Sequence, residues 1–573
     1  MSPQSHARTW QRFLLAALLF LFIGRIVLTY RVFNDSMDEN THIRAGLEIL
    51  QKRTYTVEAQ HPPLARFMVA VLPFFLAGLR VNEHNEIWGH GAWTFGSTDF
   101  YWKSLALARA GNLAYAVLLF CIVYHWSWRL YGVRAGLVAC LLLVCSPTLI
   151  GHASLATLDL AAAATVVTAA YFFWRWSEQP GLRYCLASAA AFGLAALSKF
   201  SALYFLPPLA LLYFVEAGLR RWRREGAPRG AAIGKSAGRG VVFCAVFFFL
   251  VWAGYLFDVG IILPPGHQYR GPFRGGAEQS APGLMLRTLG RRRLPAHQFV
   301  RGIIDVLSHN RQGQKAYLLG HITDHGWWYY FPVAVGVKTT IPMLALAGMG
   351  IALYATGRYA AGARGTLSPL LAVAVILGLS TQANLNIGVR HVLPIYPLFA
   401  ILAAGLWADP ERLPGRRRTL ALAATALAVW QVGESVAAHP DYLAYFNQIA
   451  RGREERFLLD SNLDWGQDLA RLGRFQQEHH IETIHLNYFG VTIPGKVGVR
   501  AIELPPFKPV EGWSAISLNK LIGVYNDRSE FKWLRERMPT ARAGKSIWIY
   551  YVPPGDRALS PGPPGPSGAD SRP

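Results

Sequence analysis

Apolar segments about as long as a bilayer is thick recur along this chain, and they limit its fold more than any other feature. A helix needs about 20 mostly apolar residues to cross the hydrocarbon core of a membrane. About eleven segments approach that length, and the shortest connections, near residues 150 and 200, also allow a re-entrant hairpin. The segments cover residues 13–31, 104–126, 134–151, 155–174, 182–199, 200–216, 240–258, 332–355, 367–383, 391–408 and 418–437. The sequence therefore predicts an α-helical polytopic membrane protein.

The composition agrees with this class of protein. Of the 573 residues, 52% are hydrophobic and 16% are charged, which is too apolar for a soluble protein. The formal net charge is +23, but the arginines gather in short loops, so membrane lipid is the expected partner and nucleic acid is not. The five cysteines lie in or beside apolar segments, where they act as small core residues. The first apolar segment follows Arg8 and Arg12 and lacks a small-residue cleavage site, so we expect a retained helix.

The basic residues also predict the orientation, because cytoplasmic loops carry an excess of Lys and Arg. With the N-terminus in the cytoplasm, about eleven crossings leave the C-terminal segment outside. The short loops then predicted inside contain Arg129, Arg134, Arg175, Arg183, Arg220, Arg221, Arg223, Arg224, Arg229, Lys235, Arg239, Arg358, Arg364, Arg412, Arg416, Arg417 and Arg418. The long segment 259–331 carries many arginines too, but long loops are exempt from the rule. We expect a multi-pass protein of the plasma (inner) membrane.

Three predicted regions lie outside the membrane on the far side from the cytoplasm. Within a transmembrane domain of residues 1–437, these are the first outer loop, 32–103, with interfacial helices at 42–52 and 64–79, and the long outer loop, 259–331. Residues 438–552 are less apolar and predict a small extracytoplasmic α/β domain. Its expected strands are 483–488, 514–518 and 547–551, and its expected helices are 471–478 and 529–537. The tail, 553–573, is rich in Pro, Gly and Ser and is expected to be disordered.

Ionisable residues gather at the helix ends that this orientation places outside. Such groups are unfavourable at a bilayer edge, so a cluster of them indicates a functional site. Asp38 and Glu39 follow the first segment and start a helix patterned by Ile43, Leu47 and Leu50. A carboxylate at a helix N-terminus is stabilised by the helix dipole. The pair predicts a general base at the membrane surface, or else a helix cap.

The same loop carries a second candidate motif. His61 precedes Pro62 and Pro63, which fix the chain in an extended form before the next helix. We expect His61 to be held in a defined place, together with His42 and Arg66, as part of a substrate-binding surface. The alternative is an ordinary turn at the start of a helix.

Four more candidates come from later segments. Asp159 lies about one turn inside an otherwise apolar helix, so a partner or a water-filled cavity is expected. Lys199 ends another segment, where it holds a phosphate or extends to the surface. Arg390 and His391 begin a later segment, and arginine suits bidentate phosphate binding. The alternative for this pair is an interfacial anchor.

The segment 459–468 (LDSNLDWGQD) is dense in polar groups. It predicts acceptor binding or a lid, or else a turn and cap feeding the next helix, and we favour the latter over a catalytic role. Its aspartates lack the spacing and the terminal glutamate of a calcium loop.

Together these motifs resemble the GT-C membrane glycosyltransferases, over roughly residues 10–470. The nearest branches are the protein O-mannosyltransferases and the aminoarabinose transferase of lipid A. The resemblance is carried by the Asp-Glu pair, the Pro-Pro turn, Asp159 and Lys199, in that order along the chain. The segment 459–468 is similar to the C-terminal part of bacterial lipid-carrier-dependent members. The resemblance implies a GT-C-like fold.

The resemblance also implies roles for the candidate residues. Asp38 falls on the catalytic aspartate of the first outer loop, with Glu39 as the second choice, and Asp159 matches the second acidic position. Lys199 matches the lysine that contacts the donor phosphate in the aminoarabinose branch. That branch has a charged residue before its Pro-Pro, where this chain has His61.

The implied reaction moves a sugar from a polyprenyl-phosphate carrier to an acceptor hydroxyl of a protein, lipid or glycan outside the cytoplasm. Asp38 is expected to take the hydroxyl proton in one inverting displacement, while cationic side chains stabilise the leaving phosphate. The reaction requires no cofactor, and a role for a divalent cation stays open. Two other classes remain as alternatives: a transporter with an outward-facing polar site, and a scaffold that recruits partners.

Overall fold

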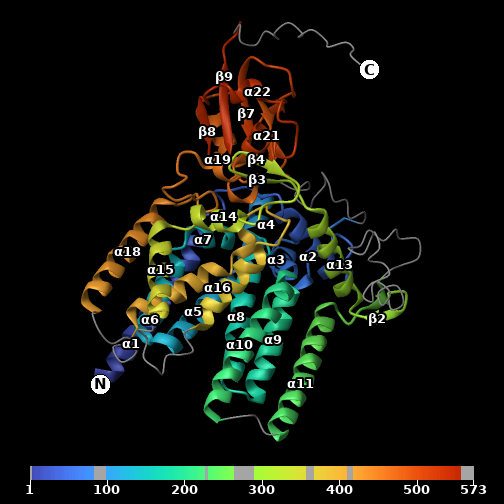
Figure 1. Ribbon diagram of the computed structural model, residues 1–573. Coiled ribbons are helices and arrows are strands. Elements are labelled where there is room, and N and C mark those ends of the chain that lie inside the picture. Colours follow the sequence, from blue (N-terminus) through green and yellow to red (C-terminus); the bar gives the residue numbers. More distant parts are fainter. Residues whose placement is uncertain are drawn as a thin grey trace, which may run out of the picture.

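The computed structural model describes residues 3–82, 98–225, 230–262, 290–356, 367–408 and 417–555. A bundle of helices carries a small C-terminal sheet domain at one end, and the N-terminal end of α1 (Pro3–Val27) lies at the other (Figure 1). Parts of the predicted outer loops, several of the predicted basic loop residues and almost all of the predicted disordered tail fall outside the described residues.

The bundle is built from helices of very different lengths. Its first half contains α2 (Glu39–Lys52), α3 (Pro63–Leu76), α4 (Thr98–Ala110), α5 (Leu113–Tyr131), α6 (Val133–Val144), α7 (Pro147–Ala153), α8 (Asp159–Glu178), α9 (Leu182–Ser198) and α10 (Ser201–Glu225). Its second half contains α11 (Gly230–Gly254), α13 (His297–Gln312), α14 (Tyr330–Lys338), α15 (Ile341–Ala355), α16 (Leu367–Ser380), η4 (Val389–Val392), α17 (Ile395–Ala404), η5 (Gly405–Trp407) and α18 (Arg417–Ala437). Each predicted apolar segment falls on one to three elements of the bundle.

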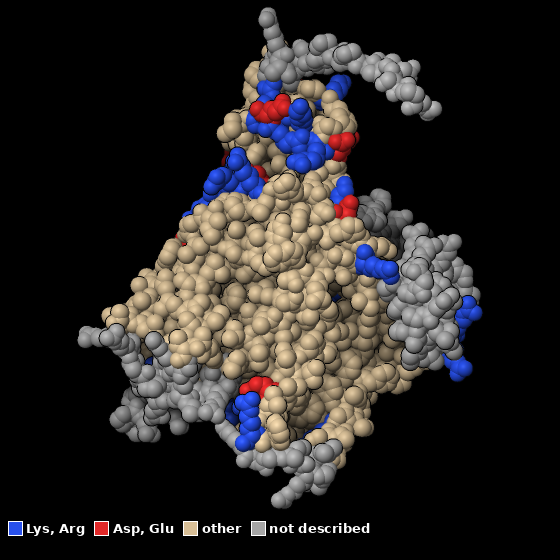
Figure 2. Space-filling model, in the orientation of Figure 1, with Lys and Arg blue, Asp and Glu red and all other residues tan. Residues whose placement is uncertain are grey.

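The surface of the bundle has the character of a membrane protein. On the face that Figure 2 shows, a broad band around the helices is almost free of charged side chains, whereas Lys, Arg, Asp and Glu gather on the C-terminal domain and at the opposite end. Within the described residues, five helices are long and apolar enough to cross a membrane, and up to seven spans result when each bent helix pair counts as one. The chain is therefore a helical multi-pass membrane protein.

Two of the predicted segments are bent. The segment 134–151 forms α6 and α7, whose axes differ by 66°, and the segment 332–355 forms α14 and α15, whose axes differ by 115°. In both pairs a proline occupies the first turn of the second helix, a position where its missing N–H group costs no hydrogen bond. The bends bring the ends of α7 and α14 toward the side of the bundle that carries the C-terminal domain (Figure 1).

The predicted helices of the first outer loop are α2 and α3, which pack tightly against each other. A Cβ atom on Gly46 of α2 would lie only 2.1 Å from the carbonyl oxygen of Arg66 in α3, so glycine permits the close approach of the two backbones. Both helices lie near the C-terminal domain (Figure 1). This packing fixes the start of α2, where Asp38 is the N-cap residue.

The C-terminal domain contains a mixed five-stranded sheet in the order β6-β5-β7-β9-β8. The predicted strands coincide with β5 (Ile484–Asn487), β7 (Gly512–Ser517) and β9 (Ile547–Val552), and β6 (Ala501–Glu503) and β8 (Ala541–Ala543) complete the sheet. β5 pairs in parallel with β6 and β7, and β9 pairs antiparallel with β7 and β8. Of the predicted helices, 471–478 forms part of α20 (Leu469–Glu478), and 529–537 is reduced to α22 (Lys532–Arg535).

Short elements join the bundle to this domain. Two hairpins, β1 (Val259–Ile261) with β2 (Arg293–Pro295) and β3 (Ala316–Leu318) with β4 (His321–Thr323), flank α13 in the sequence. The remaining short elements are α19 (Glu454–Phe457), η6 (Asp460–Asn462), η7 (Pro494–Val497) and α21 (Leu518–Ile522). Leu318 of β3 forms a bridge with Leu458, so the second hairpin contacts the start of the C-terminal domain.

Candidate active site

The structure brings Asp38 and Arg390 together from opposite parts of the chain. An Arg390 guanidinium nitrogen donates to Asp38 Oδ2 at 2.5 Å, and the side chains are 31% (Asp38) and 11% (Arg390) exposed. Asp38 belongs to the start of α2 and Arg390 to the turn η4. Asp38 therefore combines a charged partner with access to solvent, as a group that meets a substrate must.

A second ion pair joins Asp159 and Lys199. Asp159, the first residue of α8, is almost fully buried, and its Oδ1 accepts a hydrogen bond of 2.7 Å from Lys199 Nζ. Its other oxygen accepts from Thr157 at 3.2 Å and lies 4.0 Å from His152 Nδ1. Lys199 ends α9 at the break before α10. The partner predicted for a carboxylate at this depth is therefore a lysine of the next helix.

His61 lies among the charges of both ion pairs. Lys199, Asp38, Arg390 and Asp159 all act electrostatically on its ring. Burial and the positive charge of Lys199 lower the pKa of His61 to about 4, so the imidazole is neutral near pH 7. The four charged residues predicted from separate motifs therefore converge around His61.

Glu58 holds this part of the first loop in place. Its carboxylate lies 2.8 Å from His61 Nδ1 and forms an ion pair with Arg66, which also donates to the backbone oxygen of Glu58 at 2.6 Å. Arg66 is buried and fully engaged in these contacts, apart from its Nε. Arg66 thus supports the loop, whereas His61 borders the charged cluster.

Two further histidines have ring nitrogens without protein partners. The ring of His42 lies 5.3 Å from that of His61, and the ring of His391 lies 6.4 Å from that of Phe331. In the described part of the chain, His42 Nδ1 and His391 Nε2 are buried and make no hydrogen bond. A buried polar atom without a partner is unfavourable, so these nitrogens are suited to meet a bound ligand.

Glu39 has a different environment from its neighbour Asp38. It is completely buried, and its carboxylate accepts two hydrogen bonds of 2.8 Å from the guanidinium of Arg109. The backbone N–H groups of Ser36 and Ala156 donate to it as well, at 2.8 and 2.7 Å. These bonds engage both oxygens, so Glu39 joins the first loop to α4 and to the start of α8.

Sequence reasoning overlooked several residues that build the site. Arg109 had a signal, because an arginine inside an apolar segment needs a partner. Glu58 lies three residues before His61, a spacing at which side chains can meet. His152 and Trp465 carried no such signal, since their place beside Asp159 and Arg390 depends on contacts between distant segments.

The charges of the two ion pairs cancel formally. Arg390 and Lys199 supply two cations, and Asp38 and Asp159 supply two carboxylates. An incoming phosphate must therefore compete with a carboxylate for a cation. Asp38 is the more exposed carboxylate, at 31% against 2% for Asp159, whereas the two cations are similarly exposed, at 11% for Arg390 and 13% for Lys199.

An apolar groove of about 340 Å³ lies next to these residues along the chain. It is lined by the second half of α2, the start of α3, and the ends of α9 and α11, with Arg53 as its charged side chain. Leu197 and Pro63 in its wall are each two residues from a site residue, Lys199 and His61. The groove has the chemistry to hold a hydrocarbon chain beside the charged cluster.

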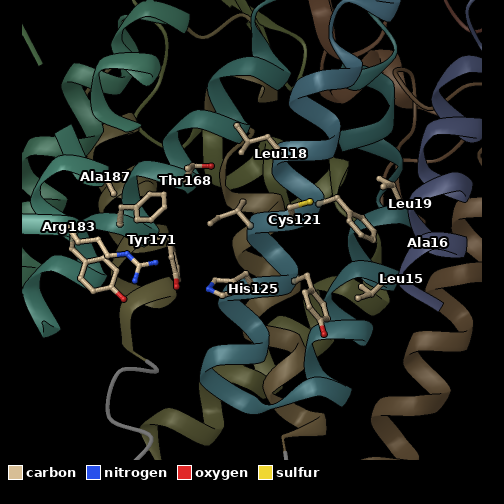
Figure 3. Close-up of a pocket in the computed structure, with 15 residues that line it drawn as sticks. Leu15, Ala16, Leu19, Leu118, Cys121, His125, Thr168, Tyr171, Arg183 and Ala187 are labelled. Carbon is tan, nitrogen blue, oxygen red and sulfur yellow. The ribbon is translucent and has the colours of Figure 1, made fainter. Parts of the chain in front are cut away.

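A larger cavity of about 670 Å³ lies between α1, α5, α8 and α9. Figure 3 shows His125, Tyr171 and Arg183 along one side of it and apolar side chains such as Leu19 and Leu118 elsewhere. Its lining residues include no carboxylate, in contrast to the cluster around Asp38 and Asp159. Across the described residues, no group of three His, Cys, Asp or Glu side chains is arranged to hold a metal ion.

Comparisons with known proteins show what the chain resembles. Residues 100–253 match the family model described as dolichyl-phosphate-mannose-protein mannosyltransferase. The Pmt1–Pmt2 protein O-mannosyltransferase complex of S. cerevisiae, solved with its sugar donor, is 12% identical with a TM-score of 0.51, over 75% of this chain and 90% of that chain. ArnT from Cupriavidus metallidurans, solved with undecaprenyl phosphate, is 13% identical with a TM-score of 0.48, over 97% of this chain and 100% of that chain. No curated protein matches the chain.

The predicted resemblance to GT-C glycosyltransferases is thus confirmed. Over residues 100–253 the chain resembles the dolichyl-phosphate-mannose-protein mannosyltransferases, and it shares its fold with the Pmt1–Pmt2 complex. The matched residues include Asp159 and Lys199, whereas Asp38 and Arg390 lie outside them. The roles of Asp38 and Arg390 therefore rest on their geometry.

Proposed function

We propose that this chain transfers a sugar from a polyprenyl-phosphate carrier to an acceptor hydroxyl, with inversion at the anomeric carbon and Asp38 as the general base. The observation that carries the proposal is the Asp38–Arg390 pair, in which a partly exposed carboxylate contacts the guanidinium that can receive a phosphate. The family description, which names a dolichyl-phosphate-mannose donor, supports the same class of carrier.

In this proposal the donor phosphate binds between Arg390 and Lys199. Arginine binds phosphate through two parallel N–H groups, and lysine adds a compact positive charge. The hydrocarbon tail lies in the groove bordered by α2, α3, α9 and α11, whose wall approaches Lys199 through Leu197. His42 Nδ1 and His391 Nε2, which are buried and have no hydrogen-bond partner among the described residues, are then available for polar groups of the sugar or the acceptor.

The chemical step is one displacement. Asp38 accepts the proton of the acceptor hydroxyl as its oxygen attacks the anomeric carbon. The bond from that carbon to the phosphate oxygen breaks on the opposite side, and polyprenyl phosphate leaves with the electron pair. Arg390 and Lys199 stabilise the charge that develops on the phosphate. Asp159 keeps Lys199 in place, and Glu39 keeps the Asp38 loop in place, so neither has to contact the reacting atoms.

We also propose eleven crossings, with the N-terminus in the cytoplasm and the site at the outer face. The opposite positions of the N-terminus and the C-terminal domain support an odd number of crossings (Figure 1). In this arrangement residues 1–437 form the membrane domain and 438–552 the outer domain, with 32–103 and 259–331 as outer loops.

Mass spectrometry of lipids that purify with the chain tests the proposal. The samples are the wild type, Asp38→Asn, Lys199→Gln and the control Lys532→Gln, whose lysine is 69% exposed on the C-terminal domain. A polyprenyl-phosphate sugar is expected on the wild type and the control, in larger amount on Asp38→Asn, and much less on Lys199→Gln. Its mass identifies the sugar.

The absence of this lipid would contradict the proposal. If no sample carries such a lipid although the membrane extract contains it, the proposed donor is wrong. Counterflow of a soluble sugar by the chain in proteoliposomes would then support the transporter instead.

A further inference from the structure

The polar segment 459–468 is buried throughout, although six of its ten residues carry polar or charged side chains. Burying such groups is unfavourable unless each finds partners. Their partners lie in three places: the loop that carries Asp38, the turn that carries Arg390, and the C-terminal sheet domain.

The first set of contacts reaches the Asp38 loop. The backbone N–H of Met37, the residue before Asp38, donates to the carbonyl oxygen of Trp465 at 3.0 Å. The side-chain amide of Asn34 donates to the carbonyl oxygen of Gly466 at 2.7 Å and accepts from the backbone N–H of Ala470 at 3.1 Å. The backbone just before the proposed base is therefore tied to this segment.

The second set of contacts reaches the Arg390 turn. The guanidinium of Arg390 lies over the ring of Trp465, 4.3 Å from its centroid. The backbone N–H of Val389 donates to Asn462 Oδ1 at 2.9 Å, and Ser461 Oγ donates to the carbonyl oxygen of Ile387 at 2.6 Å. Trp465 thus meets both halves of the ion pair, through its backbone toward Asp38 and through its ring toward Arg390.

The third set of contacts fixes the segment to the sheet domain. Asp464 accepts a 2.8 Å bond from the backbone N–H of Asn519, whose side chain donates to the carbonyl oxygen of Asp464 at 2.7 Å. Asp468 accepts from the backbone and hydroxyl of Ser546 at 3.1 and 2.9 Å, and Tyr525 donates to Asp460.

Lys338 adds support from the membrane helices. It is buried at the end of α14, and its Nζ donates to the carbonyl oxygens of Asn462 and Leu443 at 2.6 and 2.7 Å. These two bonds from a buried lysine hold the segment at the bend between α14 and α15.

We infer that the segment 459–468 is a clamp through which the C-terminal domain sets the relative position of Asp38 and Arg390, with Trp465 as the positioning residue. The inference rests on the proposed roles of those two residues. In it, the C-terminal domain is part of the catalytic apparatus without contacting the reacting atoms. The polar residues of the segment are explained by positioning, and neither an acceptor site nor a lid is needed to account for them.

Variants of Trp465 test the positioning role. Trp465→Phe keeps an aromatic face under Arg390, whereas Trp465→Leu removes it. We expect Trp465→Leu to lower kcat by about 10²-fold, the effect of misplacing a catalytic group by about 1 Å, with an unchanged KM for the donor. Trp465→Phe should restore most of the rate. Equal kcat values for Trp465→Phe and Trp465→Leu, or a higher KM without a lower kcat, would overturn the inference.

A second experiment does not depend on activity. Asn519→Ala removes two side-chain bonds, one donated to the carbonyl oxygen of Asp464 and one accepted from the backbone N–H of Asp460. Asn487→Ala, which loses one 3.3 Å bond to Leu504 within the domain, is the control. Hydrogen exchange at the Met37 amide should become at least about tenfold faster in Asn519→Ala and stay unchanged in Asn487→Ala. Unchanged exchange in both variants would disprove the clamp. If exchange is faster in Asn519→Ala and Asp38→Asn still turns over at the wild-type rate, the clamp is supported and the role of Asp38 as the general base is wrong.

Discussion

At the scale of single residues, Asp38 and Glu39 show how adjacent carboxylates come to differ. Asp38 ends an irregular loop and meets Arg390 at a surface that solvent reaches, whereas Glu39 begins α2 and points into a buried network around Arg109. Successive helix residues point about 100° apart, so two neighbours at a helix start face different surroundings. The sequence could identify the pair, and only the packing distinguishes the exposed member from the structural one.

Replacing these two residues should therefore have different effects. Asp38→Asn keeps the size of the side chain and removes the base, so we expect transfer to fall by about 10²–10⁴-fold with little change in thermal stability. Glu39→Gln leaves Arg109 buried without its charge partner, which costs about 3–5 kcal/mol of stability. Initial rates and thermal melts of both variants in detergent check this. Wild-type turnover by Asp38→Asn would contradict the assignment.

His61 makes the stability of the chain depend on pH. The folded chain keeps the ring neutral down to its pKa of about 4, whereas an unfolded histidine takes up a proton near its ordinary value of 6.5. Between these values the unfolded state binds more protons. Stability is therefore fully present above about pH 6.5 and decreases as the pH falls toward 4.

Thermal melts across this pH range measure the effect. The wild type should lose stability steadily from pH 6.5 to 4, and His61→Gln, which has no titrating ring, should lose less over the same interval. Lys532→Gln, a change at a largely exposed lysine of the C-terminal domain, serves as the control for general acid effects. Parallel curves for the wild type and His61→Gln would contradict a buried neutral ring at this position.

At the scale of elements, apolar periodicity predicted most of the helices and strands. The predicted interfacial helices at 42–52 and 64–79 correspond to α2 and α3, and the strand at 547–551 corresponds to β9. The bend between α14 and α15 was not predicted, because average hydropathy over 332–355 is insensitive to a change of direction. The pairing of Asp159 with Lys199 was also beyond the pattern, since it depends on how two apolar helices pack.

The close packing of α2 against α3 leads to a prediction about stability and transfer. Gly46→Ala places a methyl group against the Arg66 carbonyl oxygen, so α2 must move and carry Asp38 with it. We expect a loss of about 1–3 kcal/mol of stability and a clear loss of transfer. Gly378→Ala in α16, where nothing lies within 4 Å of the added atom, should change stability by no more than about 1 kcal/mol. Thermal melts and initial rates of both variants test this prediction. Equal stability and equal rates of transfer for the two variants would contradict this role for Gly46.

At the scale of the whole molecule, the face that Figure 2 shows carries most of its charged side chains at the two ends of a largely uncharged band. The site residues gather at one end of that band, between the helix ends and the C-terminal domain. A protein that takes its donor from the bilayer benefits from this arrangement, because the lipid tail stays in the apolar band while its phosphate reaches the charged cluster. The proposed reaction would then take place where a water-soluble or membrane-bound acceptor can approach.

Because the two ends are separate, an experiment can determine which side of the membrane each end of the molecule faces. Met538 is 89% exposed on the C-terminal domain, and Trp222 is 58% exposed near the end of α10, at the opposite end of the bundle. In a variant without the five native cysteines, a membrane-impermeant thiol reagent added to intact cells should label Met538→Cys and leave Trp222→Cys unlabelled. After permeabilisation both should react, because each position is open to water. Labelling of Trp222→Cys alone in intact cells would place the Asp38 cluster in the cytoplasm, where the acceptor would have to be a cytoplasmic molecule and the proposed orientation would be wrong.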